Sequence, residues 1–186
     1  RRKNYKRNHI LNIIRYSSSN ISRSDIKRET EYSMTTVLNT VAELIDKKLI
    51  YEDEPSRNET RIGRKPTYLH LNPAGAYFIG IEFNIQKMYW AILNFSGVVI
   101  HSNHIEIENN VTSEKILKHL FSCIDNAMQV LGDEYSKCLG IGIGMPGYID
   151  SEKGIALHYA YIDDWHNLPI TSQVENKYNI PCYILN

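Results

Sequence analysis

Short polar side chains gather near the start of a helix that the sequence predicts from Ser33 onward. Thr35, Thr36 and Asn39 lie in its first turns, on the side away from the apolar residues. Hydroxyl groups can contact phosphates or base edges, and an amide such as that of Asn39 can bridge N6 and N7 of adenine. This chemistry is typical of a nucleic-acid reader, although a plain three-helix bundle with a polar outer face has the same spacing.

The segment from Gly142 to Gly147 matches the G-x-G-x-x-G pattern of dinucleotide-binding loops. That pattern binds a pyrophosphate only when a helix N-terminus follows it. Here Pro146 lies inside the pattern, and residues 148–154 are typical of a turn. We therefore interpret the glycines of the preceding strand as positions of close backbone packing, and Pro146-Gly147 as a bend at the end of that strand.

The remaining chemistry-bearing residues indicate no catalytic or metal site. His101 and His104 lie three residues apart in a predicted strand, so their side chains fall on opposite faces. Asp163-Asp164 is typical of carboxylates that cap or solvate a turn. The three cysteines are far apart, so we expect buried thiols rather than a disulfide framework or a zinc site.

The elements that position the polar side chains are short helices at the front of the chain. Apolar residues at i, i+3 and i+4 predict a helix from about residue 5 to 16. Ser22 is expected to cap a second helix from 23 to about 30, and Ser33 a third that ends at Lys47 or Lys48. Two helices joined by a tight turn, the second with short polar side chains near its start, favour a helix-turn-helix.

Two predicted strands, residues 49–52 and 67–71, flank a polar segment from 53 to 66. A β-hairpin with a basic tip directly after the helices is a wing, and its Arg side chains can reach phosphates or a narrow minor groove. The basic residues concerned are Arg61, Arg64 and Lys65. A solvated charged loop is the alternative, since acidic residues dilute the charge of this segment.

Charge divides the chain into a basic front and an acidic remainder. Up to Lys65 it has 15 Lys and Arg against 9 Asp and Glu, a net charge of +6; from Pro66 onward the counts are 6 and 12, a net charge of −6. A basic module that meets a polyanion would produce this asymmetry, although chance also produces it. No long apolar run and no signal peptide is present, so we expect a cytoplasmic protein without membrane contact.

After Asn72-Pro73 the pattern changes to that of an α/β layer. Strands are predicted over residues 77–83, 87–95, 98–107, 137–145 and 181–185, and helices over 113–131 and 171–178. The order β-β-β-α-β-α-β fits the RNase-H-like topology of actin-type domains. We therefore predict an α+β or α/β protein in two domains. A winged helix-turn-helix spans 1–71, and an incomplete actin-like (RNase-H-like) ATPase-fold lobe spans 72–186.

These segments together resemble the ROK family of repressors and sugar kinases. Ser22-Arg23 and residues 33–48 resemble the helix-turn-helix of its repressors. Gly63-Arg64-Lys65-Pro66 and Leu71-Asn72-Pro73 are similar to the wing exit and junction of that family. The segments that resemble the front lobe of its sugar domain are Gly140 to Gly147, Asp150, Gly154-Ile155, Trp165 to Pro169 and Ile184-Leu185-Asn186.

With the helix-turn-helix pattern, the resemblance implies two groups of binding residues. DNA contacts are expected from Arg23, Ser33, Thr35, Thr36, Asn39, Arg61, Arg64 and Lys65. Sugar contacts are expected from Gly147, Tyr148, Ala160 and Asn186. Gly147 matches a glycine whose backbone lies beside the sugar, Ala160 a small or polar residue near the ring, and Asn186 an Asn that hydrogen-bonds sugar hydroxyls. Each of the four also has an ordinary interpretation as a turn or packing residue.

The sequence departs from the kinases of this family at one loop. Kinase members have Asp-x-Gly-Gly-Thr after the first strand, where glycine N–H groups bind the ATP phosphates. Here residues 82–86 are Glu-Phe-Asn-Ile-Gln, and Phe83 and Ile85 carry side chains where close approach requires none. We therefore predict that the protein is not an enzyme and that the 186-residue chain binds no cofactor.

The family continues beyond the position of Asn186 with an Asp, a second lobe and a His/Cys zinc site. We expect the chain to be a fragment of a longer protein, with a structural zinc and further sugar ligands in the missing C-terminal part.

The sequence thus predicts a transcriptional repressor of sugar-utilisation genes that binds operator DNA as a homodimer or higher homo-oligomer. A sugar or sugar phosphate is expected to release it. The alternative is a ROK-type sugar kinase with an appended DNA-binding domain, which the loop at residues 82–86 disfavours. A third reading is a constitutive DNA-binding protein with a vestigial sugar lobe. The sequence identifies neither the sugar, nor the operator, nor the direction of the effector's action.

Overall fold

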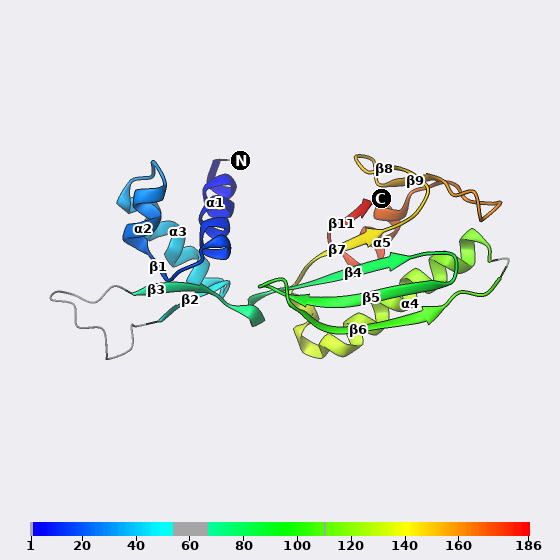
Figure 1. Ribbon diagram of the computed structural model, residues 1–186, viewed down its shortest axis with the longest axis horizontal. Coiled ribbons are helices and arrows are strands. Elements are labelled where there is room, and N and C mark those ends of the chain that lie inside the picture. The colour runs from blue at the N-terminus through cyan, green and yellow to red at the C-terminus, as the bar shows by residue number, and fades with distance from the viewer. Residues whose placement is uncertain (1, 54–66, 110) are drawn as a thin grey trace. The chain divides into compact units, whose positions relative to one another are not determined.

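The computed structural model describes residues 2–53, 67–109 and 111–186, and it divides into two compact units, Arg1–Gly75 and Ala76–Asn186 (Figure 1). The unit boundary lies later than the predicted boundary between Leu71 and Asn72. The Asn72 backbone N–H donates to the Leu49 carbonyl at 2.9 Å, and its side-chain amide donates to the Lys48 carbonyl at 2.7 Å. These two bonds attach Asn72, which directly follows the strand predicted over residues 67–71, to the first unit.

Helices and one small sheet make up the described part of the first unit. Its elements are α1 (Arg2–Tyr16), β1 (Ile21–Ser22), α2 (Arg23–Glu29), α3 (Met34–Asp46), β2 (Ile50–Asp53), β3 (Tyr68–Leu71) and a 3-10 turn at Pro73–Gly75. The strands are antiparallel in the order β1-β3-β2. The sequence did not predict β1, because two residues are too few to show an alternating pattern.

The core of the first unit is aliphatic and draws on every helix. Its fully or nearly fully buried members are Ile10, Ile14, Ile21, Ile26, Val37, Val41, Leu44, Ile50 and Leu69. The apolar side of the third helix is buried at Val37, Val41 and Leu44, whereas Ile45 is only partly buried. Burial of such side chains contributes about 1.5–3 kcal/mol each, which fixes the face that α3 turns outward.

The two strands predicted to flank the basic segment do pair. β2 and β3 are antiparallel in a register that runs from Ile50 opposite Leu71 to Asp53 opposite Tyr68. The segment between them lies outside the described residues, and with it the predicted positions Arg61, Arg64 and Lys65.

The second unit has a mixed five-stranded sheet. Its elements are β4 (Tyr77–Phe83), β5 (Lys87–Asn94), β6 (Val99–Glu106), α4 (Ser113–Leu131), a 3-10 segment (Gly132–Lys137), β7 (Cys138–Gly144), β8 (Tyr148–Asp150), β9 (Ile155–His158), β10 (His166–Leu168), α5 (Ile170–Tyr178) and β11 (Cys182–Leu185). The sheet order is β11-β7-β4-β5-β6, with β7 parallel to β4 and to β11 and the other pairs antiparallel. The chain therefore has a mixed α+β fold.

Alternation along the strands decides which face of the large sheet is covered. Tyr77, Ile79, Ile81 and Phe83 of β4 are buried in the same core as the apolar stripe of α4, and α4 lies along the sheet in Figure 1. Helices α4 and α5 also meet each other, since the Tyr178 hydroxyl donates to the Phe121 carbonyl at 3.1 Å.

Three short strands correct the prediction for the segment after β7. Residues 148–154 were expected to form a turn, but β8 occupies Tyr148–Asp150 and pairs with β9, which pairs with β10. Strands of three or four residues carry too little alternation to be predicted. The expectation of close packing was also wrong at Gly142, where a Cβ would meet nothing within 4 Å.

Within the described part of the chain, no helix is both long and apolar enough to cross a membrane.

Candidate functional site

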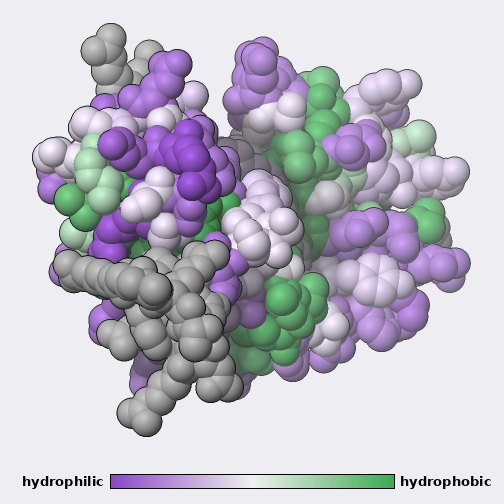
Figure 2. Space-filling view, turned by 60° about the vertical axis from the view of Figure 1, so that its left-hand side comes forward, coloured by the Kyte–Doolittle hydropathy of each residue, from purple (hydrophilic) through white to green (hydrophobic). Residues whose placement is uncertain are grey.

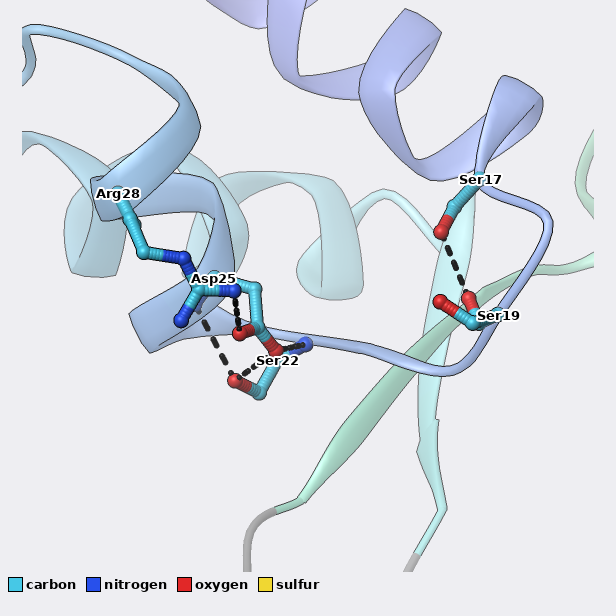
Figure 3. Close-up of polar contacts among 5 residues, drawn as sticks. All are labelled: Ser17, Ser19, Ser22, Asp25 and Arg28. Atoms are coloured by element: carbon cyan, nitrogen blue, oxygen red, sulfur yellow. Dashed lines mark hydrogen bonds and ion pairs between the residues drawn. The ribbon is translucent and has the colours of Figure 1, made fainter.

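A reciprocal cap fixes the start of α2. The Ser22 hydroxyl oxygen accepts a hydrogen bond from the Asp25 backbone N–H at 3.3 Å. The Asp25 carboxylate in turn accepts from the Ser22 backbone N–H at 3.0 Å and from the Ser22 hydroxyl at 2.7 Å (Figure 3). These bonds from Ser22, together with the Arg28 guanidinium 2.6 Å away, hold the pKa of Asp25 below its usual value. The N-terminus of α2 is thus a capping box.

A second serine cap fixes the start of α3. The Ser33 hydroxyl oxygen accepts from the Thr36 backbone N–H at 3.2 Å, and the two side-chain hydroxyls lie 2.9 Å apart. The Thr30 backbone N–H donates to the Ile26 carbonyl at 3.0 Å and so ends α2 before the turn that leads to α3. The predicted contact residues Ser33 and Thr36 therefore already serve as helix-capping groups.

The outward face of α3 consists of uncharged side chains. Thr35, Leu38, Asn39 and Ala42 are all exposed, and their spacing of three and four residues places them on one face. The side chains of Thr35 and Asn39, both predicted contact residues, make no hydrogen bond with any residue that the structure describes. Their hydroxyl and amide groups are available to an external partner.

Arg23 is engaged within the protein. Its guanidinium forms an ion pair with Glu52 of β2, and its Nε is buried without a partner among the described residues. The guanidinium of Arg23 therefore already has a partner within the first unit, unlike the side chains of Thr35 and Asn39.

Sequence reasoning missed two cations and one apolar side chain near α3. Ser24, Lys27 and Arg28 of α2 line a surface hollow together with Met34, the first residue of α3. Leu38 is 44% exposed, which is high for an aliphatic residue in the middle of a helix. A helical projection could have found Leu38 from its offset relative to Val37 and Val41. The hollow is formed by the packing of α2 against α3. The periodicity of one helix gives no information about that packing.

In the second unit, two of the predicted sugar residues are joined directly. The Asn186 side-chain amide donates a hydrogen bond to the Gly147 carbonyl. Gly147 has a φ of +93°, and a Cβ there would lie 2.3 Å from the His158 carbonyl oxygen. The predicted bend after β7 is therefore confirmed, and no helix follows it. Only glycine fits this position without displacing backbone.

The other two predicted sugar residues lie in the same part of the second unit. Tyr148 pairs with His158 across β8 and β9 and is 73% exposed. Ala160 is exposed and follows Tyr159, whose ring lies in the core edge-to-face with Phe83. The structure thus brings the C-terminal ends of β7 and β9 together, which is the kind of edge where α/β sheets place ligands.

The hairpin between β4 and β5 uses its own backbone donors. The Asn84 side-chain oxygen accepts from the backbone N–H groups of Gln86 and Lys87, each at 2.9 Å, and the Asn84 N–H donates to the Lys87 carbonyl at 2.9 Å. Phe83 is buried against Trp165. Three N–H groups of this turn are therefore unavailable to a phosphate.

The remaining candidate residues have structural positions. Asp164 was expected to cap or solvate a turn; instead it accepts from the backbone N–H and the hydroxyl of Ser113, each at 2.8 Å, at the start of α4, whose N-cap is Thr112. His101 stacks on Trp90 with ring centroids 5.1 Å apart, whereas His104 lies beside Tyr89. No three His, Cys, Asp or Glu side chains among the described residues are placed to hold a metal ion.

All three cysteines are buried free thiols, as predicted. Burial raises the pKa of Cys123 to about 11 and that of Cys182 to about 12.

Residues 78–186 match the ROK family. The chain belongs to that family. A curated relative, the xylose repressor of Caldicellulosiruptor bescii, is 33% identical over 166 residues, which cover 89% of this chain and 41% of the relative. The chain therefore spans about two fifths of the length of that relative.

Solved structures show the same fold. A ROK family transcriptional regulator described as a homologue of the Escherichia coli Mlc protein superposes with a TM-score of 0.80 at 24% identity, over 99% of this chain and 46% of that one. A ROK family glucokinase from Streptomyces griseus superposes with a TM-score of 0.51 at 21% identity, over 60% of this chain and 33% of that one.

Proposed function

We propose that this chain is the DNA-binding and effector-responsive front part of a ROK family transcriptional repressor of sugar-utilisation genes. In this proposal the first unit is a winged helix-turn-helix, with α3 as the helix that enters the major groove. The second unit is one lobe of an actin-like (RNase-H-like) sugar domain. The outward face of α3 carries the proposal, because its free amide and hydroxyl groups stand on a helix held rigidly by a core and a cap.

The charge around α3 supports the same partner. Lys27 and Arg28 border the start of α3, and the chain up to Lys65 has a net charge of +6. Cations beside a groove-entering helix neutralise phosphates and supply affinity that does not depend on sequence. Arg61, Arg64 and Lys65 stay a prediction from the sequence as wing contacts.

The effector is proposed to be a sugar or sugar phosphate bound beside Gly147 and Asn186, with Tyr148 and Ala160 nearby. The name of the Caldicellulosiruptor bescii relative makes xylose the first sugar to test. An effector that prefers the conformation with weak DNA binding lowers the affinity of the protein for DNA. Bound DNA then lowers the affinity of the protein for the effector by the same factor. We expect a homodimer on a two-fold operator, since helix-turn-helix proteins commonly bind paired half-sites.

A non-enzymatic role is part of this proposal. The second unit shares its fold with a glucokinase, but the hairpin of Asn84 has already used three of the backbone donors that a phosphate would need. The protein is therefore proposed to bind its ligand without transferring phosphate to it.

The first test replaces Asn39 with Ala. Duplexes selected by the 186-residue chain from a random library serve as probes beside unselected duplexes, and fluorescence anisotropy gives both affinities. If Asn39 makes a bidentate contact with adenine, the variant loses about 1–3 kcal/mol on selected DNA and keeps its affinity for unselected DNA.

The matched control is Asn12→Ala, which removes an exposed amide from α1. It should bind both kinds of DNA as the unaltered chain does. Equal binding of selected and unselected DNA by the unaltered chain would contradict the proposed function.

A further inference from the structure

The outward face of α3 differs from the solvent-facing side of α4, the longest helix among the described residues. α4 exposes charged residues that form ion pairs, such as Lys118 with Glu114 at 2.8 Å and Asp125 with Lys177 at 3.1 Å. In α3 the only charged residues are Glu43 and Asp46, near its C-terminal end. The first nine residues of α3 therefore carry no charged side chain, and the exposed face that they form is uncharged.

Leu38 lies in the middle of that surface. It is 44% exposed and stands between Thr35 and Ala42 on the same face, with Asn39 beside it. The face thus combines one amide with the methyl groups of Thr35, Leu38 and Ala42. Figure 2 shows mostly hydrophilic residues on the forward face of the first unit, with a small number of hydrophobic residues among them.

The surroundings of the face determine which partner fits it. Lys27 and Arg28 lie beside the start of α3, and Arg28 is also paired with Asp25. A partner with negative charge at this border and methyl groups at the centre fits the face. Double-stranded DNA has both, with phosphates along the groove and the C5-methyl group of thymine on its floor. A charged side chain at position 38 would lose its hydration at the base edges without gaining a matched partner.

We propose that Leu38, with Ala42 beside it, contacts the C5-methyl groups of thymines in the operator and is a specificity-determining residue. The inference rests on the proposed function. It adds recognition of thymine, a base for which the sequence analysis assigned no contact residue. Leu38 and Ala42 are about 6 Å apart along the helix axis, and successive bases are about 3.4 Å apart. The pair can therefore contact thymines at adjacent or next-but-one positions of a half-site, beside the adenine expected for Asn39.

The test removes one methyl group at a time from the DNA. A duplex selected by the 186-residue chain is remade with deoxyuridine in place of each thymine in turn, which keeps the hydrogen-bonding edge and removes only the C5-methyl group. We expect the affinity to fall about fourfold at one or two thymines per half-site, the change that corresponds to about 0.8 kcal/mol per buried carbon.

Leu38→Ala identifies the protein side of the contact. Its affinity for the thymine duplex should fall by a similar factor, and deoxyuridine at the sensitive positions should then cost nothing further. Leu139→Ala, which shortens a leucine that is 49% exposed in the second unit, is the matched control and should respond to deoxyuridine as the unaltered chain does. Thermal unfolding should show no loss of stability in either variant.

Two outcomes would overturn the inference alone: equal sensitivity of the unaltered chain and Leu38→Ala to deoxyuridine, and no sensitivity at any position. A selected site without thymine would also lack adenine, so it would overturn this inference and the contact expected for Asn39 together. A change of oligomeric state in Leu38→Ala with unchanged DNA affinity would assign the face to a protein contact and would also overturn it. Failure of the chain to select any sequence would instead reject the proposed function, and this inference with it.

Discussion

Gly147 is the residue at which backbone conformation and the proposed ligand edge coincide. Its φ of +93° is unfavourable for a side chain, and a Cβ would lie 2.3 Å from the His158 carbonyl oxygen and 3.2 Å from the Tyr159 Cα. Its own carbonyl accepts the Asn186 amide. Movement of Gly147 would therefore also move the point at which Asn186 is held.

We predict that Gly147→Ala destabilises the second unit by about 1–3 kcal/mol or more, because the strained φ and the backbone collision add. The matched control is Gly142→Ala, where φ is not positive and a Cβ meets nothing within 4 Å. Urea unfolding followed by the fluorescence of Trp90 and Trp165 measures both. Equal stability of the two variants would contradict this account of Gly147.

At the scale of elements, the helix caps could be predicted and the shortest strands could not. Ser22 and Ser33 were visible because a serine before an amphipathic segment acts through its nearest neighbours in sequence. β1 exists because Ile21 and Ser22 pair with Leu69 and Tyr68, far along the chain. Such a strand is stabilised by its partner rather than by its own residues.

The same distinction applies to the candidate site. Thr35 and Asn39 were found from helical spacing alone, and both are exposed as expected. The engagement of Arg23 was not foreseen, because its partner Glu52 lies on a strand after α3. Neither was the bond between Asn186 and Gly147, which requires β11 to lie beside β7. Contacts between distant segments depend on which strands pair and in which register. The pattern of a single segment indicates a strand but not its partner.

The capping box of α2 gives an element-scale prediction. Ser22→Ala should lower the free energy of unfolding of the first unit by about 1 kcal/mol at neutral pH, since it removes an acceptor for the Asp25 N–H. The pKa of Asp25 is lowered in the folded chain. Its contribution to stability is therefore fully present above the usual value of 3.8 and is lost as the pH falls through the folded pKa.

The difference between the unaltered chain and Ser22→Ala should accordingly shrink as the pH falls below 3.8, in urea titrations followed by circular dichroism. Ser17→Ala is the control, because the Ser17 hydroxyl donates only to the Ser19 carbonyl at the end of α1 (Figure 3). Its smaller effect should not vary over this range. A difference for Ser22→Ala that stays constant with pH would show that Asp25 is not coupled to the cap.

At the scale of the whole molecule, the two units have separate cores and separate chemistry. The aliphatic core of the first unit supports an exposed, uncharged helix face. The larger core of the second unit includes aromatic residues, among them Phe83 and Trp165. Phe83 belongs to this core and is the last residue of β4, directly before the turn where the resemblance to ROK kinases places their phosphate loop. We therefore expect the packing of Phe83 in the core to disfavour phosphate binding at this turn.

The last prediction follows from that turn. Neither the 186-residue chain nor a longer form of the protein should hydrolyse ATP or phosphorylate sugars. A phosphate loop stabilises its ligand with backbone N–H groups that point outward, whereas here Asn84 accepts two of them and Lys87 accepts a third.

Removing the Asn84 side chain would free two donors but would leave Phe83 buried and the turn without glycines. Asn84→Ala should therefore stay as inactive as the unaltered chain. A coupled assay over a panel of hexoses and pentoses, with a ROK family glucokinase as the positive control, measures both. Turnover that rises in proportion to the concentration of the unaltered chain, through successive purification steps, would show that phosphate is bound elsewhere and that the protein is an enzyme.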